Sequence, residues 1–176
     1  ERGIEQIVET VIKRLQKEGV EFSAPDRSPE SSSTPSDGVF HEIEDAIEAA
    51  ADAQKQLLSL PLKAREQIIQ AIRDVGNANA ETYGRMEFEE TGLGKSQDNV
   101  KKNQAACLVL GMEDLQPEVF SGDKGVTIIE RTPVGVIASV NPVTNGAPTI
   151  LFNAIMMLAG GNTVVNNPHP KTRKVS

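Results

Sequence analysis

The spacing of apolar and polar residues between Gly135 and Pro170 predicts a strand, a helix and a second strand in direct succession. An apolar β-type run at residues 134–140 is followed by a polar loop at 141–146. An apolar segment of helical length covers 147–159, two glycines end it at 160–161, and a second β-type run covers 163–165. This order is typical of a βαβ unit, which requires parallel strands in a covered sheet. Ligands of open α/β sheets bind at the carboxyl ends of the strands. Both predicted strand ends carry Asn and Pro with Thr or His, so we expect binding residues there.

Apolar residues at helical spacing predict four helices ahead of this unit. The expected helices are residues 40–58, residues 62–77, a segment through Tyr83 to Thr91-Gly92, and residues 96–110. We expect them to form a helical cap on the sheet.

Two β-type runs follow the helices, residues 126–131 and 134–140, joined by Thr132-Pro133. The second run is almost entirely apolar or small, which is typical of a central strand buried on both faces. The first run carries Glu130 and Arg131, so we expect it to be more exposed.

A separate amphipathic stripe lies near the start of the sequence, within residues 1–19. Its apolar positions follow one face of a helix: Ile4, Ile7, Val8, Val11, Ile12 and Leu15. The stripe is compatible with a docking helix for a partner or with a helix packed on its own domain. The next segment, residues 20–38, favours docking, because Ser23–Gly38 contains three prolines, six serines and no large apolar side chain. Such a composition predicts a disordered linker, and a helix of about three turns on a tether needs a partner surface. The body then covers residues 39–176.

Composition and charge exclude several classes of function. The 176 residues carry a net charge of −7 and a pI of about 4.9, which argues against nucleic acid as a partner. No apolar run has the length needed to span a membrane. The single cysteine cannot form an internal disulfide, so a cytoplasmic setting is expected. Aromatic residues make up only 3%, which is little for a self-sufficient core.

Two short signals in the helical part have ordinary structural interpretations. Gly94-Lys95-Ser96 resembles the end of a phosphate-binding loop, but Glu89 occupies the position of the first glycine, and a helix precedes it instead of a strand. We interpret it as a turn between helices. Cys107 lies in an apolar run with no neighbouring His, so we interpret it as a small core residue rather than a nucleophile.

The sequence resembles the aldehyde dehydrogenase superfamily in two motifs and the segment between them. The motifs are the loop Asn141-Pro142-Val143-Thr144-Asn145 and the strand end Asn167-Pro168-His169-Pro170, and between them lie an apolar helix and Gly161-Asn162. The two motifs are most similar to the CoA-acylating enzymes of bacterial microcompartments, and the segment Glu89–Lys95 also matches in order. The resemblance implies an α/β fold: a helical N-terminal part followed by the start of a Rossmann-like parallel sheet, an incomplete cofactor-binding domain. It also implies oxidation of acetaldehyde, propionaldehyde or lactaldehyde with CoA and NAD to acyl-CoA and NADH.

Carried over to this sequence, the resemblance assigns roles to individual residues. Asn145 matches the asparagine that stabilises the oxyanion of the thiohemiacetal. The expected NAD contacts follow the two strands: Val140, Asn141, Pro142, Val143, Asn167, Pro168, His169 and Pro170. Many non-acylating relatives carry lysine at the position of Asn167, so its absence favours NAD over NADP. His169 is either a ligand contact or an idle turn residue between two prolines. No metal is expected.

The resemblance also implies a small aldehyde substrate, a homo-oligomer when complete, and a shell protein of a microcompartment as the partner of residues 4–15. In the family the nucleophilic cysteine lies downstream of the position of Ser176, so we expect this chain to be the N-terminal portion of a longer enzyme and inactive by itself. The alternative is a non-catalytic targeting or assembly module with a vestigial cofactor half-site. A third interpretation, an α/β domain unrelated to the family, would leave the joint match of both motifs to chance.

Overall fold

The computed structural model describes Lys13 and residues 38–176. The predicted docking residues Ile4, Ile7, Val8, Val11, Ile12 and Leu15 lie outside the described residues, as does nearly all of the predicted linker. Within the described part of the chain, no helix is long and apolar enough to cross a membrane.

The four predicted helices are present ahead of the βαβ unit. They are α2 (Ile43–Ser59), α3 (Leu62–Ala78), α4 (Ala80–Thr91) and α5 (Ser96–Ala106). Leu60 is extended because the residue before a proline disfavours helical backbone, so α2 ends there. Gly92 ends α4 in the left-handed conformation, with φ of 69°. The turn after it contains Gly94-Lys95, which confirms the interpretation of that motif.

Helix α5 is shorter than predicted. We expected it to continue to Leu110, but it ends at Ala106. The guanidinium of Arg73 on α3 donates a hydrogen bond of 2.8 Å to the Val109 carbonyl, and Leu108 is 78% exposed. The apolar run 105–110 therefore does not continue one buried helical face. A 3₁₀ turn, η2 (Met112–Asp114), follows it.

The predicted βαβ unit is confirmed, with strands β3 (Val136–Val140) and β4 (Thr163–Asn167) around helix α6 (Gly146–Ala159). The strands are parallel, with Val136 opposite Thr163 and Val140 opposite Asn167. Strand β4 is two residues longer than predicted. It is followed by the 3₁₀ turn η3 (Pro170–Thr172).

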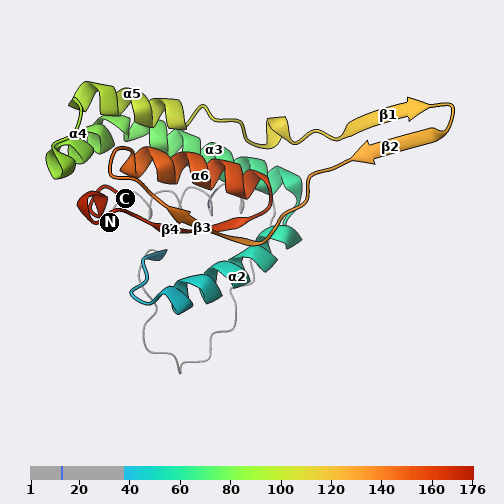
Figure 1. Ribbon diagram of the computed structural model, residues 1–176, viewed down its shortest axis with the longest axis horizontal. Coiled ribbons are helices and arrows are strands. Elements are labelled where there is room, and N and C mark those ends of the chain that lie inside the picture. Colours follow the sequence, from blue (N-terminus) through green and yellow to red (C-terminus); the bar gives the residue numbers. More distant parts are fainter. Residues whose placement is uncertain (1–12, 14–37) are drawn as a thin grey trace.

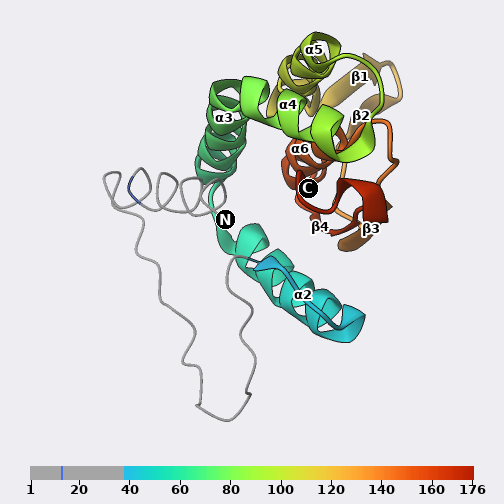
Figure 2. The same ribbon diagram turned by 90° about the vertical axis from the view of Figure 1, so that its left-hand side faces the viewer.

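The elements form layers around α6. Figure 1 and Figure 2 show the strands between α6 on one side and α2 on the other. Helices α3 and α5 pack on the opposite face of α6, where the core lies: Ile69, Ile72, Ala106, Cys107, Leu151, Ile155 and Ala159. The expected cap of four helices on the sheet is therefore only partly correct, because α6 is apolar around its circumference and needs covering on both sides.

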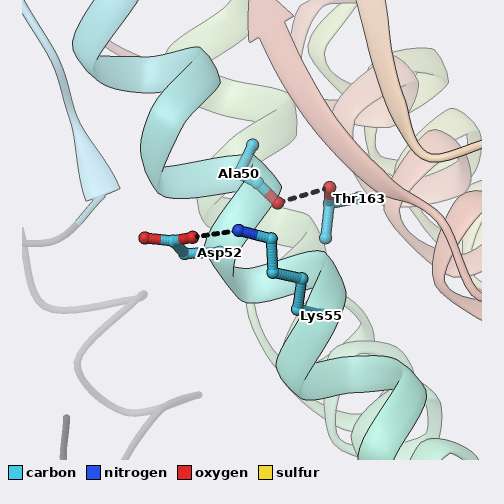
Figure 3. Close-up of polar contacts among 4 residues, drawn as sticks. All are labelled: Ala50, Asp52, Lys55 and Thr163. Atoms are coloured by element: carbon cyan, nitrogen blue, oxygen red, sulfur yellow. Dashed lines mark hydrogen bonds and ion pairs between the residues drawn. The ribbon is translucent and has the colours of Figure 1, made fainter.

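Helix α2 is joined to the start of β4 by a side-chain hydrogen bond. The Thr163 hydroxyl donates to the Ala50 carbonyl at 2.8 Å (Figure 3). The nearby pair of Lys55 and Asp52, 2.9 Å apart, is exposed to solvent. Such exposed pairs contribute little to stability, so α2 is joined to the βαβ unit by the Thr163 hydrogen bond and by a 3.4 Å hydrogen bond from the Gln54 side chain to the Gly161 carbonyl.

Strand β3 is less buried than a central strand should be. Val136 is 36% exposed and Val140 is 82% exposed, so the expectation of burial on both faces is wrong for this structure. In the described part of the chain β3 pairs only with β4, which leaves its other edge open.

A hairpin precedes β3 and extends away from the body (Figure 1). Its strands, β1 (Glu118–Gly122) and β2 (Gly125–Ile129), are antiparallel, and every residue in them is exposed. The sequence predicted β2 as a more exposed run but not its partner β1. Gly125 has φ of 128° at the turn, a conformation that favours glycine.

Candidate functional site

The parallel register brings the two predicted groups of binding residues to one edge of the sheet. Val140 and Asn167 are opposite each other at the carboxyl ends of β3 and β4. The pairing continues one residue further, because the Asn141 amide donates to the Asn167 carbonyl at 3.0 Å. The loops that begin at Asn141 and Pro168 therefore leave the sheet side by side.

Asn141 is built into the framework beneath this edge. The side chain is 2% exposed, and its Oδ1 accepts a 2.7 Å hydrogen bond from the Ser139 hydroxyl. Ser139 in turn accepts a 2.7 Å bond from the Asn153 side chain on α6, and Asn141 Nδ2 lies 3.4 Å from Asn166 Oδ1. This network joins β3, β4 and α6, so the Asn141 side chain faces the interior of the fold.

Asn145 is the N-cap residue of α6, with φ of −149° and ψ of 57°. Asparagine is preferred at this position because its side chain usually accepts a hydrogen bond from the first turn. Here the side chain makes no capping hydrogen bond, although the backbone carbonyl accepts from Thr149 N at 3.2 Å. The half-buried amide of Asn145 is therefore not used to start the helix. A neutral amide donor of this kind can stabilise a developing oxyanion.

Glu87 on α4 is a residue of this site that sequence reasoning missed. It is 1% exposed, and its Oε1 accepts a 2.7 Å hydrogen bond from Gly146 N, the first amide of α6. Burial raises the pKa of Glu87, against smaller opposing effects of the Gly146 hydrogen bond and the Lys102 charge. Glu87 shares a helix face with the buried residues Ala80 and Gly84, and that spacing was the available signal.

Gly146 lies in very close contact with the segment after β4. A Cβ atom at Gly146 would lie 2.7 Å from Cβ of Thr172. Lys102 on α5 donates a 3.1 Å hydrogen bond to the Thr144 carbonyl in the loop before Asn145. The first loop is thus held by α4 and α5 and packs directly against the second loop.

The second loop is fixed by its own side chains and by α4. His169 Nδ1 accepts from Lys171 N at 3.1 Å and caps η3, and the Thr172 hydroxyl donates to the His169 carbonyl at 3.0 Å. Glu90 accepts hydrogen bonds from Lys174 N at 2.9 Å and Val175 N at 3.1 Å. His169 therefore has a structural partner, and a ligand contact by this residue stays a prediction.

The remaining predicted cofactor residues form an uncharged rim at the edge of the sheet. Val140, Pro142, Asn167 and Pro170 are exposed, and Val143 and Pro168 are half-buried. These residues offer apolar side chains and amides, and the exposed Lys171 follows Pro170 directly. In the described residues no group of three or more His, Cys, Asp or Glu side chains could hold a metal ion.

Cys107, the chain's single cysteine, lies away from this edge in the helical core. It is 1% exposed, and its thiol donates to the Asn103 carbonyl at 3.3 Å. Burial raises the pKa of the Cys107 thiol, and the charge of Arg73 opposes this effect. The structure confirms that Cys107 is a core residue.

A pocket of about 360 Å³ lies elsewhere, between α3 and η2. Its wall contains Arg73 and Glu113, which form an ion pair of 2.7 Å. A backbone hydrogen bond at Glu113 itself is the main cause that lowers the pKa of Glu113, followed by the hydrogen bond from Arg73, with a smaller contribution from the backbone of Gly111. None of the predicted site residues lines this pocket.

Comparison with known proteins identifies the family. Residues 14–176 match the model of the aldehyde dehydrogenase family. The chain is 39% identical over 178 residues to an acetaldehyde dehydrogenase (acetylating) of Bilophila wadsworthia, covering 100% of this chain and 36% of that protein. The chain thus spans about a third of the length of this relative and matches the N-terminal part of such enzymes.

Solved structures show the same fold. A propionaldehyde dehydrogenase from the Clostridium phytofermentans fucose utilisation bacterial microcompartment is 46% identical, with a TM-score of 0.75, over 79% of this chain and 32% of that one. An engineered glycolyl-CoA reductase with bound NADP⁺ is 44% identical, with a TM-score of 0.76, over 82% of this chain and 33% of that one. The fold is therefore the mixed α/β arrangement of the family's nicotinamide-cofactor domain, as the sequence predicted. This chain belongs to the aldehyde dehydrogenase family of oxidoreductases.

Proposed function

We propose that the chain supplies half of the active site of an NAD-dependent, CoA-acylating aldehyde dehydrogenase, which converts a small aldehyde, CoA and NAD to acyl-CoA and NADH. The observation that carries the proposal is the position of Asn145. It lies at the N-terminus of α6, beside the paired ends of β3 and β4, with a side chain not used to cap the helix.

Asn145 would act on the aldehyde oxygen. When a thiolate adds to the carbonyl carbon, negative charge moves to that oxygen, and the neutral Asn145 amide donates a hydrogen bond to it. The same amide holds the oxygen while hydride leaves the carbon. Cys107 does not act as the thiolate, because it is buried among the helices. The attacking thiol is supplied by another part of the complete protein.

The strand ends would hold the cofactor, which accepts the hydride when bound. Val140, Pro142 and Val143 line one side, and Asn167 and Pro168 begin the other. Asn141 contributes from below, because its side chain fixes the two strand ends to α6. The glycolyl-CoA reductase neighbour holds NADP⁺, so preference for NAD is measured by comparing kcat/KM for the two cofactors. A kcat/KM that is lower for NAD than for NADP would contradict the prediction made from Asn167.

The partner proposal concerns residues 4–15. The apolar stripe would dock on a shell protein of a bacterial microcompartment, and the complete enzyme would be a homo-oligomer there. The solved relative from a bacterial microcompartment supports this setting. Deletion of residues 1–19 should abolish co-purification with shell proteins and leave the specific activity unchanged. Loss of activity on deletion would instead indicate a helix that belongs to the enzyme body.

The central experiment replaces Asn145 with Ala in the complete protein that carries this sequence. The substitution should reduce kcat by about 10²–10³-fold, the usual effect of losing an oxyanion donor. Thr144→Ala is the matched control, because Thr144 contributes its backbone carbonyl to Lys102 and its side chain is exposed. NADH formation should also need CoA for continued turnover. Turnover indifferent to CoA would contradict the acylating assignment, and absence of aldehyde-dependent NADH formation would favour the non-catalytic module.

A further inference from the structure

Two glutamates on one helix hold both loops of the candidate site. Glu87 and Glu90 are three residues apart on α4, so their side chains lie on the same face. Glu87 accepts from Gly146 N, where the first loop enters α6, and Glu90 accepts from Lys174 N and Val175 N after the second loop. Helix α4 therefore provides a fixed platform for two segments that come from different strands.

Glu87 is unusual because its carboxyl group is buried and only partly satisfied by hydrogen bonds. One carboxyl oxygen bonds to Gly146 N, and the other, Oε2, is buried without a hydrogen-bond partner. A buried polar atom left unpaired is unfavourable, and a small apolar side chain would avoid that cost. The stability of α4 alone thus gives no reason for a carboxyl group at position 87.

The effect of Glu87 on α6 gives such a reason. A carboxyl group at a helix N-terminus accepts a hydrogen bond from an amide that has no partner within the helix, and it interacts favourably with the helix dipole. Because Glu87 supplies this hydrogen bond from α4, helix α6 starts without a capping hydrogen bond from the Asn145 side chain. The hydrogen bond at Gly146 N also fixes the orientation of the peptide that joins Asn145 to Gly146. That peptide fixes the backbone on the C-terminal side of the Asn145 Cα, from which the side chain projects.

We propose that Glu87 is a positioning residue, which through its hydrogen bond to Gly146 N frees the Asn145 amide from helix capping and holds it toward the aldehyde oxygen. Glu90 holds the second loop against the first in the same way. The close contact of Gly146 with Thr172 joins the segments that the two glutamates hold. This inference rests on the proposed role of Asn145.

The test uses Glu87→Ala, Glu87→Gln and Glu87→Asp in the complete protein that carries this sequence. Glu87→Ala should lower kcat for the aldehyde by about 10–100-fold, because a small misplacement of a reacting group has effects of that size. The KM for the nicotinamide cofactor should change less than about twofold, since β3 and β4 remain paired. Glu87→Gln should retain kcat within about threefold, because its amide oxygen still accepts from Gly146 N. Glu87→Asp, which keeps the charge and is one methylene shorter, should resemble Glu87→Ala. Glu89→Gln is the control, because Glu89 is exposed and makes only a 3.9 Å pair with Arg85.

Coupling with Asn145 distinguishes positioning from general loss of structure. If Glu87 acts through Asn145, adding Glu87→Ala to Asn145→Ala should reduce kcat by less than about twofold more. Multiplicative effects would overturn the inference. Full activity of Glu87→Asp with loss in Glu87→Gln would also overturn it, because charge and not placement would then matter. If Glu87→Ala does not fold, the Gln and Asp variants decide between these results.

Different results would contradict the proposed function and the positioning role of Glu87. An unchanged kcat in Asn145→Ala would remove the role of Asn145 and, with it, the basis of this inference. A large loss in Asn145→Ala together with a normal kcat in Glu87→Ala would overturn the inference alone. Hydrogen exchange at the Gly146 amide gives a readout independent of activity, with protection expected in the wild type and Glu87→Gln and lost in Glu87→Ala.

Discussion

The βαβ unit, residues 136–167, and the β1–β2 hairpin, residues 118–129, contain similar β-forming side chains in very different surroundings. Strand β4 is covered by α2 and α6. Beside it, the side-chain oxygens of Asn162 and Asn141 accept hydrogen bonds from Val134 N and the Ser139 hydroxyl. The hairpin has no buried residue, and its described polar contact outside the strand ladder is the 3.1 Å pair of Arg131 and Glu118. Apolar β-type runs alone therefore do not determine burial. Covering helices and side-chain hydrogen bonds decide which run becomes part of the site.

The largest effect on this contrast should come from the centre of α6. Ile155 is 0% exposed and lies in the core between the strands and helices α3 and α5. Ile155→Ala should lower the free energy of unfolding by about 2–5 kcal/mol, because it removes buried methyl groups and leaves a cavity. Urea unfolding followed by circular dichroism measures this. Met156→Ala, at the next position and 41% exposed, is the control and should cost much less. Equal losses would show that α6 is not packed as described.

A smaller effect is expected at the start of the unit. The Asn162 side-chain oxygen accepts hydrogen bonds from Val134 N at 2.7 Å and Gly135 N at 3.0 Å, and so fixes the chain where it enters β3. Asn162→Ala leaves both amides without this acceptor and should cost about 1–3 kcal/mol in urea unfolding. Asn162→Asp keeps the oxygen and should recover most of the loss. No difference between the two variants would show that the hydrogen bonds do not stabilise this entry.

The βαβ unit and most helix boundaries were predictable because they depend on local pattern. Apolar period and the stop signals at Pro61, Gly92 and Gly160-Gly161 act within a few residues of their effect. The end of α5 at Ala106 was not, because the apolar run continues to Leu110, and the Val109 carbonyl instead accepts a hydrogen bond from Arg73, 36 residues earlier. The packing of α2 on the βαβ unit likewise involves distant partners, Thr163 with Ala50 and Gln54 with Gly161.

The pairing of the two strand ends was predictable, but the contacts that surround them were only partly so. Strand ends are marked by Asn and Pro, so the edge formed by Val140 and Asn167 could be foreseen. Glu87 was missed despite its spacing from the buried Ala80 and Gly84, because a charged helix residue is normally placed in solvent and its partner Gly146 is 59 residues later. The assignment of Asn141 as a contact residue likewise could not anticipate that its side chain would be used inside the fold.

The pH dependence of stability tests the contact between Glu87 on α4 and the start of α6. Burial raises the pKa of Glu87 in the folded state, so folding favours its protonated form. The contribution of Glu87 to stability is therefore fully present below the unfolded pKa and is lost as pH rises through the folded pKa. Compared with Glu87→Gln, the wild type should become progressively less stable over the pH range above about 4.3, the ordinary pKa of a glutamate. Urea unfolding of both proteins across this range measures the difference, and a constant difference would contradict the raised pKa.

The smallest effect should come from the hairpin. Ile128 is 62% exposed, so Ile128→Thr removes little buried surface and keeps the β-branched shape that suits a strand. The free energy of unfolding should change by less than about 0.5 kcal/mol, as for other exposed positions. Val164→Thr in β4 is the matched control, because the same kind of strand position is half-buried there and should lose more. If Ile128→Thr instead cost as much as Val164→Thr, or its effect grew with protein concentration, the hairpin would be covered in solution. The contrast between the two regions would then belong to the isolated chain and not to the protein as it assembles.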